Sequence, residues 1–379
     1  MNHFYGNLAA IPLALACGVE SQGGSSGGVD LERAATRGFA VIGSDFASST
    51  VSLLGVDGSV QSASFISSAS QAPGLSAALG GDLVLPTATL VGDDLVLIDR
   101  IPAAILTWVD LSSAQVRAQL SVATGYASNP HDYVPYSESK AFVPRFEPNL
   151  MSGREPFDGG SDVLVVDPQA ASIVDRIDMA PAFADAPAGI YARPDRAFMA
   201  GGKLRVLAVG LSADFTASAD SRLITIDPLT HTIESTLVFA GLKGCGSGEP
   251  SPDGSTLAVA CNGVAGADPA SGFPDSGVVL VDLVEPPTEL GRWTAAALAV
   301  GQINNLAWLD AEHLALLTFG RFNADGTAAE ASDEARTLDV AAGTISARSS
   351  VSGSTSAPAS AFTRRTALAT LLFLLLWHV

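Results

Sequence analysis

Three groups of imidazole, carboxyl and amide side chains in the interior of this 379-residue sequence are best suited to chemistry. They are His131 with Asp132, then Glu249, then Asn304 with Asn305. Nitrogen and oxygen atoms of these kinds bind cations and small polar ligands, and a His or Glu side chain can also move a proton. These residues are therefore the candidate ligand-binding group, on the condition that the fold brings them together.

No stronger chemical signature accompanies this group. The Asp-rich stretches lack the Asp-x-Asn/Asp-x-Asn/Asp-Gly spacing of an EF-hand loop. Residues 244–248 do not match the Gly-x-Ser-x-Gly elbow of hydrolases, and residues 23–28 lack the Lys-Ser/Thr of a phosphate loop. The sequence consequently predicts no catalytic residue, no cofactor and no metal site.

An apolar strand that ends in Asp recurs through the chain and defines the elements that must position the candidate residues. Successive copies of this Asp are 53, 57, 60, 55 and 57 residues apart. Each carboxylate can accept hydrogen bonds from backbone N–H groups of the turn that follows, and Pro168 and Pro228 fix φ in two of these turns. The copies are Asp57, Asp110, Asp167, Asp227, Asp282 and Asp339.

Between successive aspartates lie a loose leading strand, a turn and a short apolar strand. The clearest copy runs from Glu249 through the turn at Asp253 and Gly254 to Cys261. Each unit therefore supplies about four short strands, and no sustained helical period appears in residues 38–351. Such units predict an all-β fold, a β-propeller of four-stranded blades, in which closure of the ring removes exposed sheet edges.

The repeats leave the number of blades at six or seven. Six Asp-ended units are visible, and the first lacks a leading strand before Phe39. A terminal strand from residues 349–362 could complete that blade, or a seventh blade has been lost. Insertions at residues 146–160, 210–221 and 263–276 are expected to emerge as loops on the ends of the ring, where propellers usually bind.

Leading strands line the central channel of a propeller. His131, Asp132, Glu249, Asn304 and Asn305 all fall in or beside leading strands, so they are expected at the mouth of this channel. Water in the channel would by itself account for polar side chains there. The sequence thus indicates either a ligand site or a hydrated channel wall.

The repeat units resemble a known family. The run Ser251–Ala260, the start Asn129-Pro130-His131, and the strand ends Val-Val-Asp-Pro and Thr-Ile-Asp-Pro are similar to YVTN-type repeats of YncE-like and surface-layer-like bacterial propellers. The resemblance covers about residues 38–351. It implies an extracytoplasmic propeller, typically of seven blades, and specifies no activity.

The N-terminal residues 1–17 resemble a bacterial lipoprotein signal. A short apolar run, residues 8–16, ends at Cys17, and a Gly/Ser-rich tether follows at residues 18–37. The resemblance implies acylation of Cys17, and Gly18 is typical of lipoproteins sent to the outer membrane. Two features depart from the pattern: Ala14 replaces the usual Leu, and no Lys or Arg precedes Arg33. The alternative is a buried Cys17 in an apolar N-terminal strand.

The C-terminal residues 352–379 form a linker and an apolar tail. Arg364 and Arg365 precede fourteen mostly apolar residues, fewer than the roughly 20 that span a bilayer. A marginal anchor, an interfacial segment and a product of an altered reading frame all remain open. This segment is not used to predict function.

Cys245 and Cys261 are predicted to form a disulfide. In a hairpin centred between Asp253 and Gly254, paired residues have numbers that sum to about 507, and 245 + 261 = 506. One bulge would place the two cysteines opposite each other, at a Cα separation of roughly 4.5–5.5 Å that suits a disulfide. Two free buried thiols are the alternative.

The net charge disfavours one class of partner, and the features above together lead to two hypotheses of function. The sequence has 39 Asp and Glu against 20 Lys and Arg, a net charge of −19, which disfavours binding to a nucleic-acid backbone. The leading hypothesis is a non-enzymatic, lipid-anchored monomer at the cell surface, outer membrane or periplasm that binds a protein or carbohydrate through its loops. The alternative is an extracytoplasmic propeller enzyme, a metal-dependent lactonase or quinoprotein-like oxidoreductase, with its site at the channel mouth.

Overall fold

The protein is described as a computed structural model that covers residues 38–350, except 89, 91–92, 265–270, 320, 323–328, 332 and 347–348. Strands dominate this part of the chain, and two short helical segments lie wholly within it: a 3₁₀ turn, η1 (Ala180–Phe183), and a helical turn, α1 (Ala295–Leu298). The predicted signal, tether and tail, including Cys17, lie outside the described residues. Those assignments therefore stay predictions.

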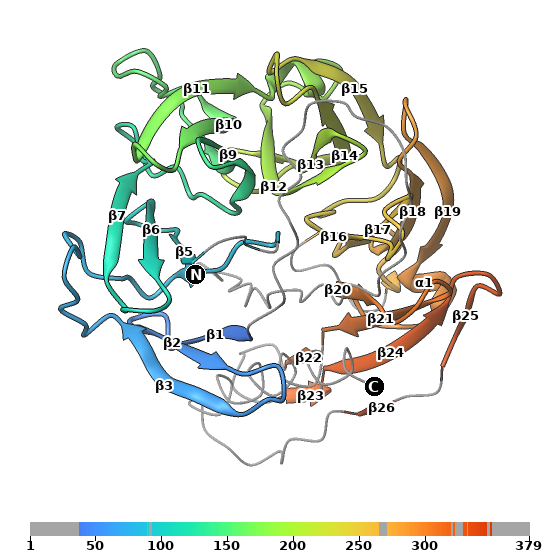
Figure 1. The fold of residues 1–379 in the computed structure, drawn as a ribbon. Helices are drawn as coiled ribbons and strands as arrows, with labels where there is room; N and C mark the ends of the chain where they lie inside the picture. Colours follow the sequence, from blue (N-terminus) through green and yellow to red (C-terminus); the bar gives the residue numbers. More distant parts are fainter. Residues whose placement is uncertain are drawn as a thin grey trace, which may run out of the picture. The chain divides into compact units, whose positions relative to one another are not determined.

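Six successive antiparallel sheets follow one another along the chain (Figure 1). In the first three sheets, neighbouring strands in the sequence are also neighbours in space. The strands are β1 (Phe39–Ser44), β2 (Ser49–Leu54) and β3 (Val60–Ser67); β4 (Leu83–Val84), β5 (Asp94–Asp99), β6 (Ile105–Asp110) and β7 (Val116–Ser121); and β8 (Val134–Ser137), β9 (Lys140–Pro148), β10 (Gly160–Asp167) and β11 (Ser172–Asp178).

The last three sheets repeat the pattern, with a two-stranded hairpin, β22 (Arg321–Phe322) and β23 (Ala329–Ala331), inserted in the sixth. The strands are β12 (Ile190–Ala200), β13 (Lys203–Ser212), β14 (Ser218–Ile226) and β15 (Ile233–Val238); β16 (Ser247–Pro250), β17 (Thr256–Cys261), β18 (Gly277–Asp282) and β19 (Thr288–Thr294); and β20 (Ile303–Trp308), β21 (His313–Thr318), β24 (Glu334–Asp339), β25 (Thr344–Ile345) and β26 (Ser349–Ser350). Six such meanders are the strand pattern of a six-bladed β-propeller, which confirms the predicted fold class.

The described C-terminal residues do not complete the first sheet, although the sequence allowed a closing strand from residues 349–362 there. The first sheet has three described strands, β1 to β3. Ser349 and Ser350, at the start of the expected closing strand, pair with Ala335 and Glu334 of β24 in the sixth sheet. The described end of the chain therefore extends the last sheet.

Each recurring Asp closes the turn after its strand, as predicted. Its carboxylate accepts one or two backbone N–H bonds from residues two and three positions ahead, at 2.8 to 3.1 Å. Asp227, for example, accepts from Leu229 and Thr230. The turn is thus satisfied by its own residues, which explains why this Asp recurs at the same place in every sheet.

Middle strands are apolar on both faces because both faces are covered. Along β17, Leu257, Val259 and Cys261 pack into a cluster with side chains of the fourth sheet. Ala258 and Ala260, which point the other way, pack with side chains of the sixth sheet. Each buried Val or Leu contributes about 1.5–3 kcal/mol relative to exposure. These clusters position the inner strands that carry the candidate residues.

The chain divides into two compact units, each described here by itself. The first contains the described residues up to Val143 together with Leu164–Asp175, and the second contains Pro144–Val163 together with the described residues from Arg176 onward. The core of the first unit joins its first two sheets through side chains such as Ile42, Val51 and Leu97.

Candidate functional site

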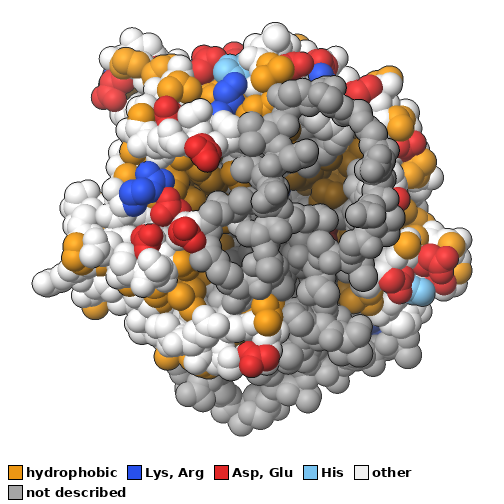
Figure 2. Space-filling view, in the orientation of Figure 1, with side chains coloured by type: hydrophobic (Ala, Val, Ile, Leu, Met, Phe, Trp, Pro, Cys, Tyr) orange, Lys and Arg blue, Asp and Glu red, His pale blue; other side chains and the backbone are white. Residues whose placement is uncertain are grey.

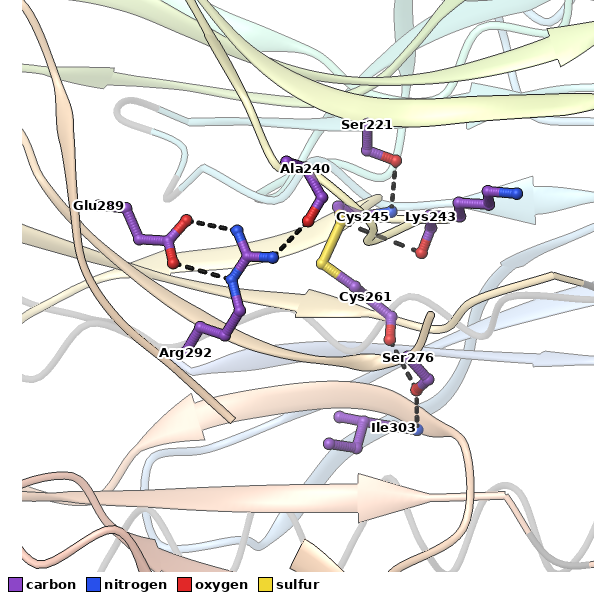
Figure 3. The surroundings of a disulfide bond; sticks show 9 residues. All are labelled: Ser221, Ala240, Lys243, Cys245, Cys261, Ser276, Glu289, Arg292 and Ile303. Carbon is purple, nitrogen blue, oxygen red and sulfur yellow. Dashed lines mark hydrogen bonds and ion pairs between the residues drawn. A yellow bond between two sulfur atoms is a disulfide. The ribbon is translucent and has the colours of Figure 1, made fainter. Parts of the chain in front are cut away.

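The predicted disulfide Cys245–Cys261 is present at the entry to β16 (Figure 3). In the β16–β17 pairing, the numbers of opposite residues sum to 507, as predicted: Ser247 lies opposite Ala260, and Pro250 lies opposite Leu257. The remaining offset of one residue is absorbed before β16, where the Gly246 N–H donates to Gly244 O in a three-residue turn centred on Cys245. The two Cα atoms lie 3.8 Å apart, closer than the separation expected from the sequence.

Hydrogen bonds around the disulfide connect it to neighbouring strands (Figure 3). The Cys245 N–H donates to Ser221 Oγ at 3.0 Å. On the other side, Ser276 Oγ donates to Cys261 O at 2.8 Å and accepts the Ile303 N–H at 3.0 Å. Ser276 thereby joins the end of β17 to the start of β20. The disulfide and these hydrogen bonds together hold the chain where β16 and β20 begin.

Glu249 and Asn305, two of the predicted residues, lie in adjacent inner strands of the second unit and connect them. Glu249 on β16 accepts the Trp308 N–H through Oε2 at 3.0 Å. Two residues earlier on the same face of β16, Ser247 Oγ donates to Asn305 Oδ1 at 2.5 Å. We refer to the contact made by Ser247, Glu249, Asn305 and Trp308 as the β16–β20 seam.

Burial changes the acidity of Glu249. Its half-buried carboxyl has one hydrogen-bond donor, the Trp308 N–H, and desolvation raises its pKa from the ordinary value of 4.5 to about 7. The Trp308 N–H opposes this shift because it favours the charged form. A carboxyl with this pKa is half protonated near neutral pH, the condition in which a side chain exchanges protons most readily.

Asn304 is placed differently from its neighbour. The pairing of β20 with β21 shifts between Ile303, opposite Thr318, and Asn305, opposite Leu317, so Asn304 is the extra residue of a β-bulge. Its amide makes no hydrogen bond with another described residue. A bulge is not visible in a sequence pattern, which is why the sequence placed both asparagines in one regular strand.

A glycine next to the disulfide allows close approach of β12 to β16. A Cβ on Gly246 would lie 2.2 Å from Asp195 Oδ2, so no larger residue fits there without movement. Asp195 lies in a second bulge, between Pro194 and Ala197 of β12. Asp195 is not among the predicted site residues, because no local sequence signature marks its carboxyl.

His131 and Asp132 belong to the first unit and have a different setting. Both precede β8, which begins at Val134, so the expected leading strand starts later than predicted. Both are buried, and Asp132 Oδ1 accepts the N–H groups of Thr87 and Tyr133 at 2.8 Å each. Asp132 therefore holds the backbone just before β8 against that of Thr87. The five predicted residues are divided between the two units.

The described residues form neither a metal-binding cluster nor a membrane-spanning helix. Among the described residues, no group of three or more His, Cys, Asp or Glu side chains is arranged to hold a metal ion. In that part of the chain, no helix has the length and apolar character needed to cross a membrane. On the face shown in Figure 2, acidic side chains are more widespread than basic ones.

The loop between β9 and β10 lies within the insertion predicted at residues 146–160 and forms a further candidate surface. Asp158 organises this loop: its carboxylate accepts the N–H groups of Gly153, Arg154 and Glu155 at 2.8 to 3.1 Å, and these bonds lower its pKa. Asn149 Nδ2 donates to Asp158 O at 2.6 Å. The loop is held in one conformation by its own polar groups.

The same loop is anchored to the sheet by an ion pair between two completely buried side chains. Arg145 on β9 donates through Nε and Nη2 to the two carboxylate oxygens of Asp162 on β10, at 2.7 Å each. Its Nη2 also donates to Phe157 O at 2.5 Å. Arg145 thus ties the middle of the loop to the strands that flank it.

The loop presents large apolar side chains to solvent. Leu150 and Met151 are 62% and 56% exposed, and Phe215, in the turn between β13 and β14, is 55% exposed. That turn occupies only about the middle of the insertion predicted at residues 210–221, because β13 and β14 extend into both ends. Part of the third predicted insertion, residues 265–270, lies outside the described residues.

Arg193 on β12 contacts the end of β9 and the turn between β13 and β14. Its guanidinium lies 4.2 Å from the Phe215 ring centroid and 5.2 Å from that of Phe146, at the end of β9. It also pairs with Glu147 at 2.5 Å and donates to Ser212 O at 2.9 Å. We refer to Leu150, Met151 and Phe215, held by Asp158 and Arg193, as the loop surface.

Comparisons with known proteins identify the fold. No family model and no curated protein matches the sequence. Among solved structures, the β-propeller domain of Cps50 (Swd1) from Myceliophteria thermophila aligns over 83% of this chain and 84% of its own, at 11% identity and a TM-score of 0.51.

Hydrazine synthase of Kuenenia stuttgartiensis aligns over 69% of this chain at 15% identity and a TM-score of 0.49. This chain spans 63% of the hydrazine synthase chain, less than two thirds of its length. Identities this low show the fold and carry no activity or partner from one protein to another. The chain is a six-bladed β-propeller.

Proposed function

We propose that this chain is an exported, non-enzymatic β-propeller that binds a protein partner through the loop surface. The observation that carries the proposal is the exposure of Leu150, Met151 and Phe215 on loops whose conformations are already fixed by Asp158 and Arg193. Exposed apolar residues on prepared loops are typical of protein interfaces, where Met and aromatic residues are enriched. Aliphatic side chains favour a protein over a carbohydrate as the partner.

The fixed loop conformation lowers the cost of binding. A mobile loop would lose conformational freedom on association, and that loss would reduce affinity. Here the three N–H bonds to Asp158 and the Phe157 bond to Arg145 order the loop before any partner arrives. Arg193 also links the end of β9, from which this loop starts, to the turn that carries Phe215.

Export and lipid anchoring are part of the proposal. The disulfide supports an oxidising compartment, because structural disulfides are rare in the reducing cytosol. The lipoprotein-like sequence around Cys17 and the resemblance to YVTN-type, YncE-like repeats support anchoring in the outer membrane, at the cell surface or in the periplasm. Expression in a bacterial host should yield a mature chain that begins at Cys17 and carries acyl groups, and Cys17→Ser should abolish that mass. An unprocessed wild-type chain would contradict the anchor.

Binding is tested by placing a photo-crosslinking amino acid at Leu150 or at Phe215 in the host that naturally makes the protein. We expect one discrete crosslinked protein from each position. Leu229 is the matched control, because it is 69% exposed but lies in the turn between β14 and β15. Equal crosslinking at all three positions would contradict the proposal, and retention on a polysaccharide without protein crosslinks would favour a carbohydrate.

An enzymatic role is the second candidate, and one observation favours it. The pKa of Glu249, raised to about 7 by burial, is suited to general acid or base catalysis. A metal-dependent lactonase or quinoprotein-like oxidoreductase would use such a group beside further ligands. Turnover of lactone or alcohol substrates that disappears in Glu249→Gln, with the Leu150 and Phe215 crosslinks absent, would favour this alternative.

A further inference from the structure

The β16–β20 seam contains two contacts of different chemistry. Ser247 and Asn305 form a neutral hydrogen bond, which does not change with pH near neutrality. Glu249 and Trp308 form two bonds: Trp308 N–H to Glu249 Oε2 at 3.0 Å, and Trp308 Nε1–H to Glu249 O at 3.1 Å. One of these bonds ends on an ionisable oxygen.

We propose that Glu249 is a proton-responsive contact between the fifth and sixth sheets, which holds β16 to β20 more tightly when it is protonated. The proposal is independent of the loop surface and of its partner. It rests on the position of the carboxyl between two sheets and on the charges that surround it.

No positive charge compensates Glu249. The strands that contact β16 are β12, β17 and β20, and β20 has no titratable side chain. On β17 only Cys261 would titrate, and it is in the disulfide. The titratable side chains of β12 are Tyr191, Arg193, Asp195 and Arg196.

The β12 groups are engaged elsewhere. Arg193 pairs with Glu147, and Arg196 Nε lies 4.0 Å from Asp195 Oδ1. Asp195 approaches Gly246, and the even-numbered residues of β16 face away from the side on which Ser247 and Glu249 contact β20. Glu249 is therefore desolvated without a cation, and this raises its pKa into the physiological range.

The two protonation states make different bonds at the same place. Ionised Glu249 is an acceptor only, and its bond from the Trp308 N–H is charge-assisted. When a proton from solvent binds, that bond becomes a weaker neutral one, and the new O–H is a donor. This loss is smaller than the cost of keeping the ionised carboxyl out of water, because desolvation raises the pKa of Glu249 and the Trp308 N–H opposes only part of that rise. The protonated form therefore fits the closed contact better.

The fixed contact at Ser247 confines the change to one end of the seam. Asn305 Oδ1 accepts both Ser247 Oγ–H and the Leu306 N–H, at 2.5 and 2.8 Å. Ionisation should therefore loosen β16 at Glu249 and Pro250 while Ser247 stays in place. The turn that follows β16 would move with the released end.

The experiment is a pH titration of the full chain with ¹³C-labelled Glu carboxyl groups, followed by NMR from about pH 5 to about pH 9. We expect one Glu carboxyl carbon to titrate with a midpoint near pH 7. Trp308 fluorescence should change with the same midpoint, and Glu249→Gln and Trp308→Phe should each remove that change. Ser247→Ala is the matched control and should retain it.

Two results would overturn the proposal. The first is that every Glu carboxyl carbon of the wild-type chain titrates below about pH 6, a measurement that requires no variant to fold. The second is a fluorescence transition near neutral pH that persists unchanged in Glu249→Gln. Failure of the loop-surface crosslinks would leave both measurements unaffected.

Discussion

The base of the β9–β10 loop and the β16–β20 seam both contain a carboxylate removed from water, but they surround it differently. Asp162 faces the Arg145 guanidinium through two hydrogen bonds and has Arg176 Nη1 at 3.5 Å. Glu249 faces a single backbone N–H. Desolvation raises the pKa of both carboxyls; at Asp162 the guanidinium groups of Arg145 and Arg176 oppose that rise, whereas at Glu249 only one backbone N–H does. The comparison teaches that two buried carboxyls can share the direction of a pKa shift and differ in whether a buried cation compensates the charge.

The largest expected effect comes from breaking the compensated pair. Arg145→Met would leave Asp162 buried with only the more distant Arg176, and we expect a loss of about 3–5 kcal/mol of unfolding free energy, measured by chemical denaturation. The double change Arg145→Met with Asp162→Leu should recover much of that loss, because no uncompensated charge remains. Arg154→Met, at an exposed position in the same loop, is the control and should change stability little. Equal effects of Arg145→Met and Arg154→Met would refute the assignment of Arg145 as an anchor.

A smaller, pH-dependent effect is expected at Glu249. Its folded pKa of about 7 exceeds the ordinary 4.5, so the fold gains stability from the protonated form in acid and loses that gain as pH rises from about 4.5 through about 7. Glu249→Gln cannot ionise and should therefore gain on the order of 2 kcal/mol relative to wild type between acidic and mildly alkaline pH. Denaturation curves at both pH values measure this difference. Glu155→Gln, at an exposed position, should show no such dependence, and a pH-independent Glu249→Gln effect would contradict the assigned desolvation.

The smallest global effect is expected at Asp158, whose pKa shifts in the opposite direction. The Gly153, Arg154 and Glu155 N–H groups lower that pKa, so its contribution to loop order is present above the ordinary pKa of 3.8 and is lost as pH falls through the lower folded value. Asp158→Ala should leave global stability nearly unchanged and speed hydrogen exchange of those three amides. It should also weaken crosslinking at Leu150. Unchanged exchange would show that the loop is ordered by other contacts.

Local, periodic features of the fold were predictable from the sequence. The Asp turns and the β16–β17 register follow from residues a few positions apart, so the Cys245–Cys261 pairing could be inferred to within one residue. Glu249 and Asn305 were identified as candidates because they occupy leading strands. These predictions required only the two-residue alternation of side chains along a strand and the hydrogen-bonding preferences of turn residues.

Features that depend on distant neighbours were not predictable. Arg145 and Asp162 look like surface charges in the sequence, because nothing local indicates that both become completely buried. The bulge at Asn304 depends on pairing with β21, and the start of β8 after Asp132 depends on hydrogen bonds from Thr87. The loop surface was anticipated only as an insertion, since the exposure of Leu150 and Met151 follows from three-dimensional packing.

The self-contained Asp turns have a consequence for how such a chain can change over evolutionary time. Because Asp227 satisfies its turn with Leu229 and Thr230, the outer hairpin of that sheet needs no residue from another sheet to close. The same holds for the copies spaced 53 to 60 residues apart. A duplicated or deleted stretch of that length would carry its own closing interaction with it, so whole blades can be gained or lost without redesign of the turns that remain.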